Sequence, residues 1–307
     1  MLAFISHHEC HDHDAGAFHP DQPIRLEAIT NQLISSGLDY VLRHYDAPRV
    51  ARAQLERVHD PDYIDRVYAL APGDGMKSVE VDGDTVMSPG TLRAAERAAG
   101  AGVLAVDLVL SGEANPAFCA VRPPGHHAEH GTAMGFCLFN NIAVAAAHAM
   151  EAHGLERVAI VDFDVHHGNG TEDIFKAETR VLFCSSFQHP FYPFTGHEKE
   201  TPNLVDVPLP AGAGSTEFRE GVEAHWLPHL EAFDPQILMI SAGFDAHVAD
   251  DMSSLALTDD DYEWVTAKLA DIAARHCEGR IVSMLEGGYE PAVLARSVVR
   301  HLNVLIG

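Results

Sequence analysis

The chain has 307 residues, 47% of them hydrophobic, which is enough for a sizeable core in one large α/β domain or two small ones. Its formal net charge of −25 argues against nucleic-acid binding, which calls for a basic surface, and against adhesion to anionic membranes. No apolar stretch approaches the roughly 20 residues of a membrane-spanning helix. The first residues carry no basic leader, so we expect a cytoplasmic location.

Apolar, β-branched runs alternate along the chain with longer segments of helical periodicity. The runs predict strands at 117–121, 157–165, 180–187, 236–241 and 280–285. The periodic segments predict helices at 89–111, 140–153, 215–233, 259–276 and 291–306, with Ser88 and Thr258 as N-caps of the first and fourth. Repeated βα units of this kind predict a mostly parallel sheet with helices on both faces. Because there is no internal repeat or convincing linker, we expect a single domain, 1–307.

Two consecutive histidines stand where a predicted strand ends, at the edge of an open sheet where ligands bind. His126 and His127 follow a Pro-Pro-Gly turn, in which both imidazoles can face one cleft and transfer protons near neutral pH. Both imidazoles need partners that orient them. Asp162 could hold the first and Asn169 the second, and a neutral asparagine would raise imidazole basicity less than a carboxylate.

A metal site is predicted after the next two strands. Residues two apart on an extended strand share a side, so Asp164 and His166 can grip one ion while Asp162 lies deeper. Asp245, after the following strand, completes three protein ligands and leaves positions open for water and substrate, as in a catalytic site. This set favours zinc and is compatible with ferrous iron. Tyr289, in a Gly-Gly-Tyr turn, can donate its hydroxyl to a substrate carbonyl and to the oxyanion.

With these motifs, which span about residues 19–289, the chain resembles the zinc-dependent histone deacetylase family, including its bacterial amidohydrolase and acetylpolyamine amidohydrolase members. The resemblance implies a three-layer arginase/deacetylase-like fold with one zinc ion per chain. It also implies roles for six side chains: metal ligands Asp164, His166 and Asp245, acid and base His126 and His127, and carbonyl polariser Tyr289.

The same resemblance extends to residues around these six. Gly135, Phe136 and Tyr192 match the walls of the family's acyl-chain tunnel, although a phenylalanine is commoner at the last position. Ser185, with Asp162, Asp164 and His166, resembles the family's buried monovalent-cation site, which would take K⁺. Arg25 matches an arginine beside the internal cavity, and Asn169 follows the class II pattern.

The predicted reaction is removal of acetyl or other acyl groups from the amine of an acylated lysine in a protein or peptide. An acetylpolyamine amidohydrolase is the alternative; the acidic charge favours it, whereas Met252 stands where polyamine-selective relatives often have an acid. Two other rivals fit less well. An arginase-like dinuclear hydrolase needs more ligands than the single carboxylate of the segment around Asp245 offers, and a non-catalytic acyl-lysine binding module could dispense with Tyr289. The oligomeric state, including a homo-oligomer, is left open.

Some residues with ligating side chains are expected to have no part in this site. The cysteines, Cys10, Cys119, Cys137, Cys184 and Cys277, form no C-x-x-C pair and should be buried small hydrophobic residues. The early histidines His7, His8, His11 and His13 lack a carboxylate-braced geometry and are expected to bind nothing specific. The acids Asp82, Asp84, Asp250 and Asp251 are expected to be solvated loop residues, with cation or substrate binding as the alternative.

Overall fold

The computed structural model describes residues 1–196 and 201–307, and its main feature is an eight-stranded sheet whose neighbouring strands all run parallel. The strand order is β2-β1-β5-β10-β9-β6-β7-β8. The strands are β1 (Ala3–Ser6), β2 (Arg43–Asp46), β5 (Ala117–Cys119), β6 (Val158–Asp162), β7 (Val181–Gln188), β8 (Leu204–Leu209), β9 (Ile237–Ala242) and β10 (Ile281–Leu285). A separate antiparallel ribbon joins β3 (Val79–Glu80) to β4 (Val86–Met87).

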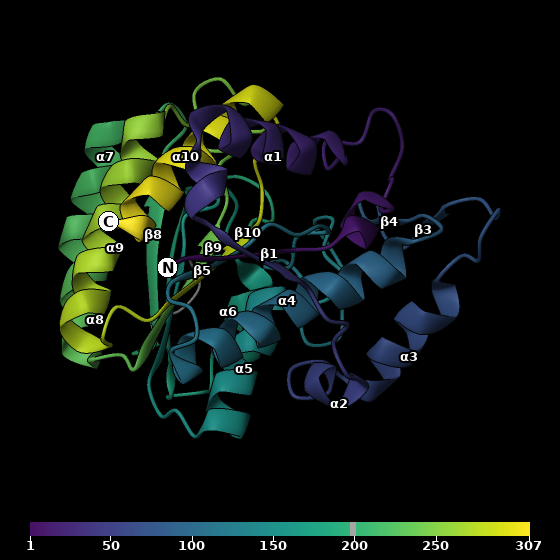
Figure 1. Cartoon of the computed structure of the whole chain (residues 1–307), viewed down its shortest axis with the longest axis horizontal. Coiled ribbons are helices and arrows are strands. Elements are labelled where there is room, and N and C mark those ends of the chain that lie inside the picture. The colour runs from purple at the N-terminus through teal and green to yellow at the C-terminus, as the bar shows by residue number, and fades with distance from the viewer. Residues whose placement is uncertain (197–200) are drawn as a thin grey trace.

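Helices cover both faces of the sheet and complete three layers (Figure 1), as the sequence predicts. One face carries α1 (Ile24–Ser36), α7 (Ser215–Gly221), α8 (Leu227–Phe233), α9 (Asp259–His276) and α10 (Pro291–Ile306). The other carries α4 (Thr91–Ser111), α5 (Asn141–His153) and α6 (Asn169–Phe175), with α2 (Arg52–Leu55) and α3 (Pro61–Leu70) further out. Short 3₁₀ turns lie at η1 (His8–His11) and η2 (Leu38–Val41). Among the described residues, no helix has the length and apolar character to cross a membrane.

The covered faces explain the apolar strands of the central sheet. Every residue of β6, β9 and β10 is buried, because a parallel sheet with helices on both sides leaves no wet face. All five cysteines are buried as well, as predicted. Polar side chains enter this core mainly where the strands end, and there they form the site described below.

The bounds of α9 and α10 are those predicted, and local chemistry explains the start of α9. The Thr258 amide donates to Asp261 Oδ2 at 2.9 Å, and the Asp261 amide donates to the Thr258 carbonyl at 2.9 Å. The Asp261 side chain thus satisfies the Thr258 amide, which has no partner within the helix. Acidic residues fill the first turn of α9 and Arg275 and His276 the last, as the helix dipole favours.

Other predicted boundaries were wrong. The helix predicted from 89 begins at Thr91, with Gly90 rather than Ser88 as N-cap. The Ser88 hydroxyl instead accepts from the Asp14 amide at 3.0 Å and contacts the Thr91 hydroxyl at 2.9 Å. The segment predicted as one helix at 215–233 contains a π-helical turn, η3 (Val222–Trp226), between α7 and α8. The elements β1, β2, β3, β4, β8, α1, α2, α3 and α6 were not predicted.

Four adjacent strands at the centre of the sheet, β5, β10, β9 and β6, position the functional site. Because they are parallel, their carboxyl ends open at the same edge. The chain leaves β5 into the His126–His127 turn, β6 into the Asp164–His166 turn, β9 toward Asp245 and β10 toward Tyr289. Segments more than 160 residues apart in the sequence therefore meet at one place, as the Gly125–Glu286 hydrogen bond illustrates.

Candidate active site

The three predicted metal ligands lie together. Ligand atoms of Asp164, His166 and Asp245 are all within 4.8 Å of one another, and the three residues are buried. His166 Nδ1 is 3.0 Å from Asp164 Oδ1 and 3.3 Å from Asp245 Oδ2. The edge of a tetrahedron with bonds of about 2.0 Å is about 3.3 Å. The spacing therefore fits a small divalent ion.

The surroundings of the two carboxylates also fit a cation. Asp164 Oδ2 accepts from the Gly287 amide at 2.8 Å, and Asp245 Oδ1 accepts from the Val165 amide at 2.9 Å. Asp245 Oδ2 is buried without any hydrogen-bond partner. Burial and repulsion by the charge of Asp164 raise the pKa of Asp245 to about 6. A cation between the two carboxylates would relieve this repulsion. A side chain at Gly287 would clash with both carboxylates.

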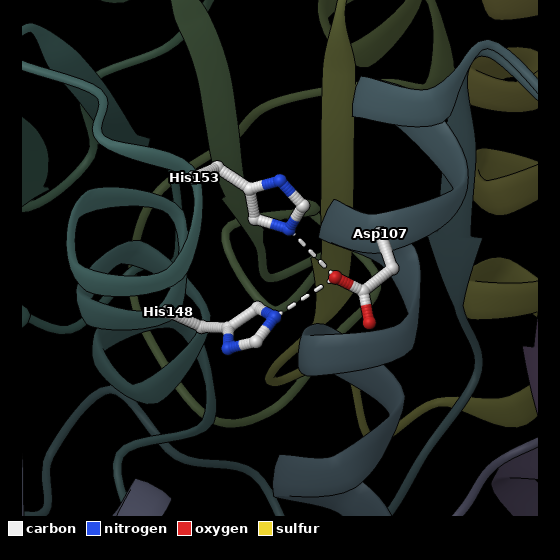
Figure 2. A group of neighbouring side chains, drawn as sticks. All are labelled: Asp107, His148 and His153. Atoms are coloured by element: carbon white, nitrogen blue, oxygen red, sulfur yellow. Dashed lines mark hydrogen bonds and ion pairs between the residues drawn. The ribbon is translucent and has the colours of Figure 1, made fainter.

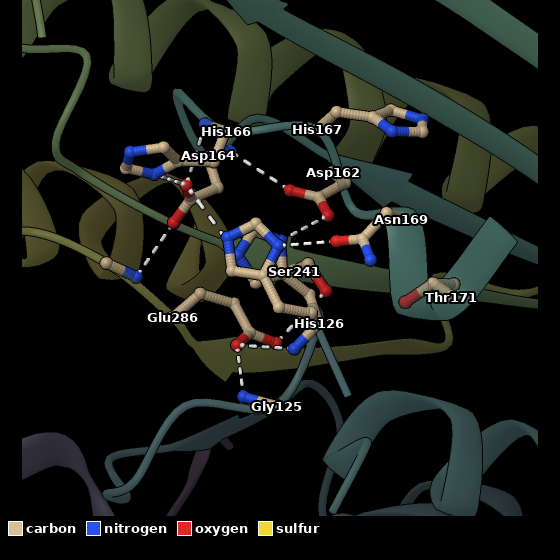
Figure 3. A network of polar contacts seen from close by, with 12 residues as sticks. Gly125, His126, Asp162, Asp164, His166, His167, Asn169, Thr171, Ser241 and Glu286 are labelled. Atoms are coloured by element: carbon tan, nitrogen blue, oxygen red, sulfur yellow. Dashed lines mark hydrogen bonds and ion pairs between the residues drawn. The ribbon is translucent and has the colours of Figure 1, made fainter. Parts of the chain in front are cut away.

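The tandem histidines lie beside this group, each held by the partner that was predicted for it. His126 Nδ1 is 2.8 Å from Asp162 Oδ2, and His127 Nδ1 is 2.7 Å from Asn169 Oδ1. The two ring centroids are 4.0 Å apart. His126 Nε2 lies 3.7 Å from Asp164 Oδ1, which links the pair to the metal ligands. Figure 3 shows this network from close by.

The hydrogen bonds of Asn169 define the tautomer of His127. Asn169 Nδ2 donates to Glu129 Oε1 at 2.9 Å, so the amide oxygen faces His127. His127 Nδ1 must then carry the proton that it donates to this oxygen, and the lone pair is on Nε2. His127 is thus oriented to accept a proton at Nε2.

The two imidazoles differ in their electrostatics. Burial lowers the pKa of His126, but the charges of Asp162 and Asp164 outweigh it and raise this pKa well above the ordinary value. Burial, with the charges of His126 and His166, lowers the pKa of His127 well below the ordinary value. The pair therefore combines a charged imidazole with a neutral one, which suits general acid and base chemistry.

Glu286 supports the histidine turn, a role that the sequence did not predict. Its Oε2 accepts from the amides of Gly125 at 2.7 Å and His126 at 3.2 Å, and its Oε1 accepts from the Ser241 hydroxyl at 3.2 Å (Figure 3). Burial raises the pKa of Glu286 to about 7. The only signal in the sequence was an acid that directly follows a buried apolar run.

Tyr289 is held from both sides of its turn. Asp250 Oδ2 accepts from the amides of Tyr289 at 2.6 Å and Glu290 at 3.0 Å. The buried Arg25 places its guanidinium 4.8 Å from the Tyr289 ring centroid and donates from Nε to the Gly288 carbonyl at 2.6 Å. The expectation that Asp250 is a solvated loop acid was wrong, since it is buried and binds backbone amides.

Aromatic rings flank His127 and Tyr289 where tunnel walls were predicted. The Phe136 ring meets the Tyr289 ring edge-on at 5.9 Å, and the Tyr192 ring meets the His127 ring edge-on at 5.4 Å. Phe191, which was not predicted, stacks on His166 at 5.5 Å. The Gly135 amide donates to Asp84 Oδ1 at 3.0 Å. Asp84 therefore accepts from a backbone amide of the turn beside the site, and the expectation that it is a solvated loop acid was wrong.

The residues predicted to bind a monovalent cation are also adjacent. Ser185 pairs with Asp162 across β7 and β6, and its hydroxyl oxygen is buried without a hydrogen-bond partner. Asp162 Oδ1 accepts from the Asp164 amide at 3.0 Å. An unpaired buried hydroxyl beside a carboxylate is compatible with K⁺, which prefers oxygen ligands.

The early histidines lie elsewhere. His7, His8 and His11 line a separate pocket of about 380 Å³ together with residues of β1, β2 and α1, whereas the ring of His13 contacts the Thr91 hydroxyl at 2.8 Å. In the described part of the chain, none of the four belongs to a group of three or more residues with metal-ligand spacing.

A buried ion cluster ties the N-terminal segment to both catalytic turns. Asp21 Oδ1 accepts from Arg25 at 2.7 Å and from Arg122 at 2.5 Å, and all three side chains are fully buried. Asp21→Asn should destabilise the fold by about 3 to 5 kcal/mol, because two buried guanidinium groups lose their shared counter-charge. Urea unfolding measures this loss. Glu113→Gln, which breaks the exposed pair with Arg43, is the control and should cost less than about 1 kcal/mol. Equal losses in the two variants would contradict the prediction.

Comparisons with known proteins agree with this fold. The sequence-family model of the histone deacetylase domain matches residues 19–305. A histone deacetylase-like amidohydrolase of Pseudomonas aeruginosa is 38% identical over 91% of this chain and 74% of its own. The polyamine deacetylase HDAC10 of Homo sapiens is 33% identical over 94% of this chain and 44% of its own. The crystal structure of the HDA15 HD domain matches with a TM-score of 0.93 at 33% identity, covering 100% of this chain and 88% of that one.

A mostly parallel sheet of this order, with acids and histidines at its central strand ends, defines an arginase/deacetylase-like hydrolase. The chain belongs to the histone deacetylase family, and its activity is that of a deacetylase.

Proposed function

We propose that this deacetylase uses zinc and removes acetyl or other acyl groups from the amine of acyl-lysine-like substrates, within a single catalytic domain, 1–307. The observation that carries the proposal is the convergence of Asp164, His166 and Asp245 with the His126–His127 pair. These three residues would hold the ion, which supplies Lewis-acid polarisation of a carbonyl and a lower pKa for water. Ferrous iron is the other ion that suits the set.

In the proposed mechanism the proton transfers and hydrogen bonds belong to side chains of this site. His127 Nε2 takes a proton from the attacking water, and the Tyr289 hydroxyl donates to the oxyanion of the tetrahedral intermediate. When the C–N bond breaks, the amine nitrogen receives a proton from a histidine of the pair, and a carboxylate and a free amine leave. Asp162 and Asn169 keep the two imidazoles oriented. Phe136 and Tyr192 would line the path of the acyl-bearing chain.

An acetylated polyamine is the second candidate substrate. The formal charge of −25 favours a cationic substrate, and one relative is named a polyamine deacetylase. Met252 weakens this candidate because it provides no carboxylate near Asp245. Measuring kcat/KM on acetyl-lysine peptides and on acetylated polyamines separates the two. We expect the peptides to be preferred, and a higher kcat/KM on the polyamines would overturn the acyl-lysine assignment.

The pH profile tests the role of His127 as base. In Asn169→Asp, a carboxylate would replace the neutral amide 2.7 Å from Nδ1 and raise the pKa of His127. A base must be neutral to act, so activity is lost as the pH falls through its pKa. The acid limb of kcat/KM should therefore move to higher pH.

In Asn169→Asp the new carboxylate would be repelled by Glu129, and the control variant removes that repulsion. Glu129 accepts from the native Asn169 amide, so Asn169→Asp combined with Glu129→Gln keeps that hydrogen bond. The double variant should show the same upward shift, and Glu129→Gln alone should show little. An acid limb that stays in place in the double variant would argue that His127 is not the base.

Three further parts of the prediction stay proposals. K⁺ would bind at Asp162 and Ser185, where the unpaired hydroxyl supports it. A cytoplasmic location can be tested by cell fractionation. A homo-oligomer remains compatible with the chain, and sedimentation would measure it.

A further inference from the structure

Among the residues that the structure describes, two groups of ligating side chains lie outside the catalytic site, and one of them joins three separate segments. His167 follows β6, Glu172 lies on α6, and Asp206 lies on the edge strand β8. His167 Nε2 is 2.9 Å from Glu172 Oε2 and 3.6 Å from Asp206 Oδ1. His167 is 1% exposed, and Figure 3 shows its ring turned away from His126 and His166. The group is therefore distinct from the catalytic centre.

The three facing atoms of this group have no hydrogen-bond partner. His167 Nε2, Glu172 Oε2 and Asp206 Oδ1 are all buried and lie within ion-pair distance, but no hydrogen bond of good geometry joins them. Buried polar atoms are nearly always paired, so three unpaired atoms that face one another indicate a shared partner. The two carboxylates favour a positive partner. Burial lowers the pKa of His167, but Asp206 and Glu172 outweigh it and raise this pKa to about 9, so a bound cation would take the place of the proton on Nε2.

The other nitrogen of His167 has a partner that suits a metal-binding imidazole. Nδ1 lies 2.7 Å from the Thr195 hydroxyl oxygen, which can accept the Nδ1 proton. In that tautomer the lone pair would be on Nε2, where a cation shared with the two carboxylates could bind it. An imidazole oriented in this way, with one nitrogen donating and the other free, is typical of a metal ligand.

The second group, Asp107, His148 and His153, lacks this feature (Figure 2). His148 Nδ1 lies 3.0 Å from Arg57 Nη1, which can only donate, so His148 Nε2 must carry the proton that it donates to Asp107 Oδ1 at 2.9 Å. His153 Nε2 is 2.7 Å from the same oxygen. This group is a satisfied hydrogen-bond cluster between α4 and α5.

We propose that His167, Glu172 and Asp206 form a second divalent-cation site that takes zinc. An imidazole and two carboxylates are ligands that zinc accepts, and the spacing of 2.9 to 3.6 Å spans the edge expected for its tetrahedral geometry. The side chains of Glu172 and Asp206 are 28% and 23% exposed, which opens a route from solvent and a position for water. The ion would link β8 to the turn and helix that carry His166 and Asn169. It would raise the zinc content from the predicted one to two per chain.

Zinc stoichiometry tests the proposal without reference to activity. The full chain is loaded with zinc, freed of excess by gel filtration and measured by elemental analysis. We expect two equivalents in the native chain and one in Glu172→Gln/Asp206→Asn, which keeps the side-chain shapes. The catalytic-site variant Asp164→Ala/Asp245→Ala should also retain one, and the four changes together none. Asp107→Asn, the matched control, should retain two.

A milder variant keeps the test decisive if the double variant folds poorly. Thr195→Val leaves all three ligands but removes the acceptor of His167 Nδ1, and should weaken the second equivalent about tenfold or more in zinc titrations. A native chain that retains one equivalent, or a second equivalent that survives both Glu172→Gln/Asp206→Asn and Thr195→Val, would overturn the second site. A loss of one zinc equivalent that occurs only in Asp164→Ala/Asp245→Ala tests the catalytic ligands, and therefore the proposed function, rather than the second site.

Discussion

Replacing Tyr289 by phenylalanine is expected to lower kcat by about 10²- to 10³-fold, the range found when one donor to an oxyanion is removed. The ring would keep its contacts with Phe136 and with the Arg25 guanidinium, so the turn should stay in place. Only the hydroxyl that stabilises the transition state is lost. Zinc content should be unchanged, and steady-state kinetics with elemental analysis on the same preparation measures both.

Tyr192 provides the matched control for this experiment. It is a second phenol beside the imidazoles, with its ring edge-on to His127, but it is not assigned a donor role. Tyr192→Phe should therefore change kcat much less than Tyr289→Phe. If Tyr289→Phe were as active as the native chain, the phenol would have no part in the mechanism. If Tyr289→Phe and Tyr192→Phe lost equal activity, the loss could not be assigned to an oxyanion donor.

Replacing Asp245 by alanine is expected to abolish activity and to remove the catalytic zinc. Asp245 Oδ2 is the buried oxygen without a partner, so the variant would leave only Asp164 and His166 as ligands. Two protein ligands do not make the three that a catalytic zinc site uses. Elemental analysis should show one equivalent less than in the native chain.

The neighbouring Asp251 gives the control for Asp245→Ala. It lies on the same loop, carries the same charge and is exposed. Asp251→Ala should retain both the zinc content and the activity of the native chain. If Asp245→Ala kept the native zinc content, the ligand assignment would be refuted, whatever happened to its activity.

The elements that the sequence predicted are those whose pattern comes from burial. The central strands are continuous apolar runs because both faces are covered, and α9 and α10 show amphipathic periodicity with clear first residues. In contrast, β2 is four mostly exposed residues at one edge of the sheet. Only pairing with β1 makes it a strand, and no local pattern reports such pairing.

The same distinction holds for the site. Side chains that point into the site stand in recognisable motifs at strand ends, so their convergence could be predicted from Asp164, His166 and Asp245. Glu286, Asp250 and Asp84 act by accepting from backbone amides. Every residue except proline has such an amide, so these contacts leave no pattern in the sequence and only the coordinates reveal them.

The position of β10 has a consequence for how the chain is made. It lies between β5 and β9 at the centre of the sheet but is the last strand to leave the ribosome. Until residues 281–285 emerge, β2-β1-β5 and β9-β6-β7-β8 are two half-sheets whose inner edges are unpaired, and such edges invite association with other chains. We expect truncation before β10 to yield an aggregating product during synthesis, since insertion of this one strand joins the halves.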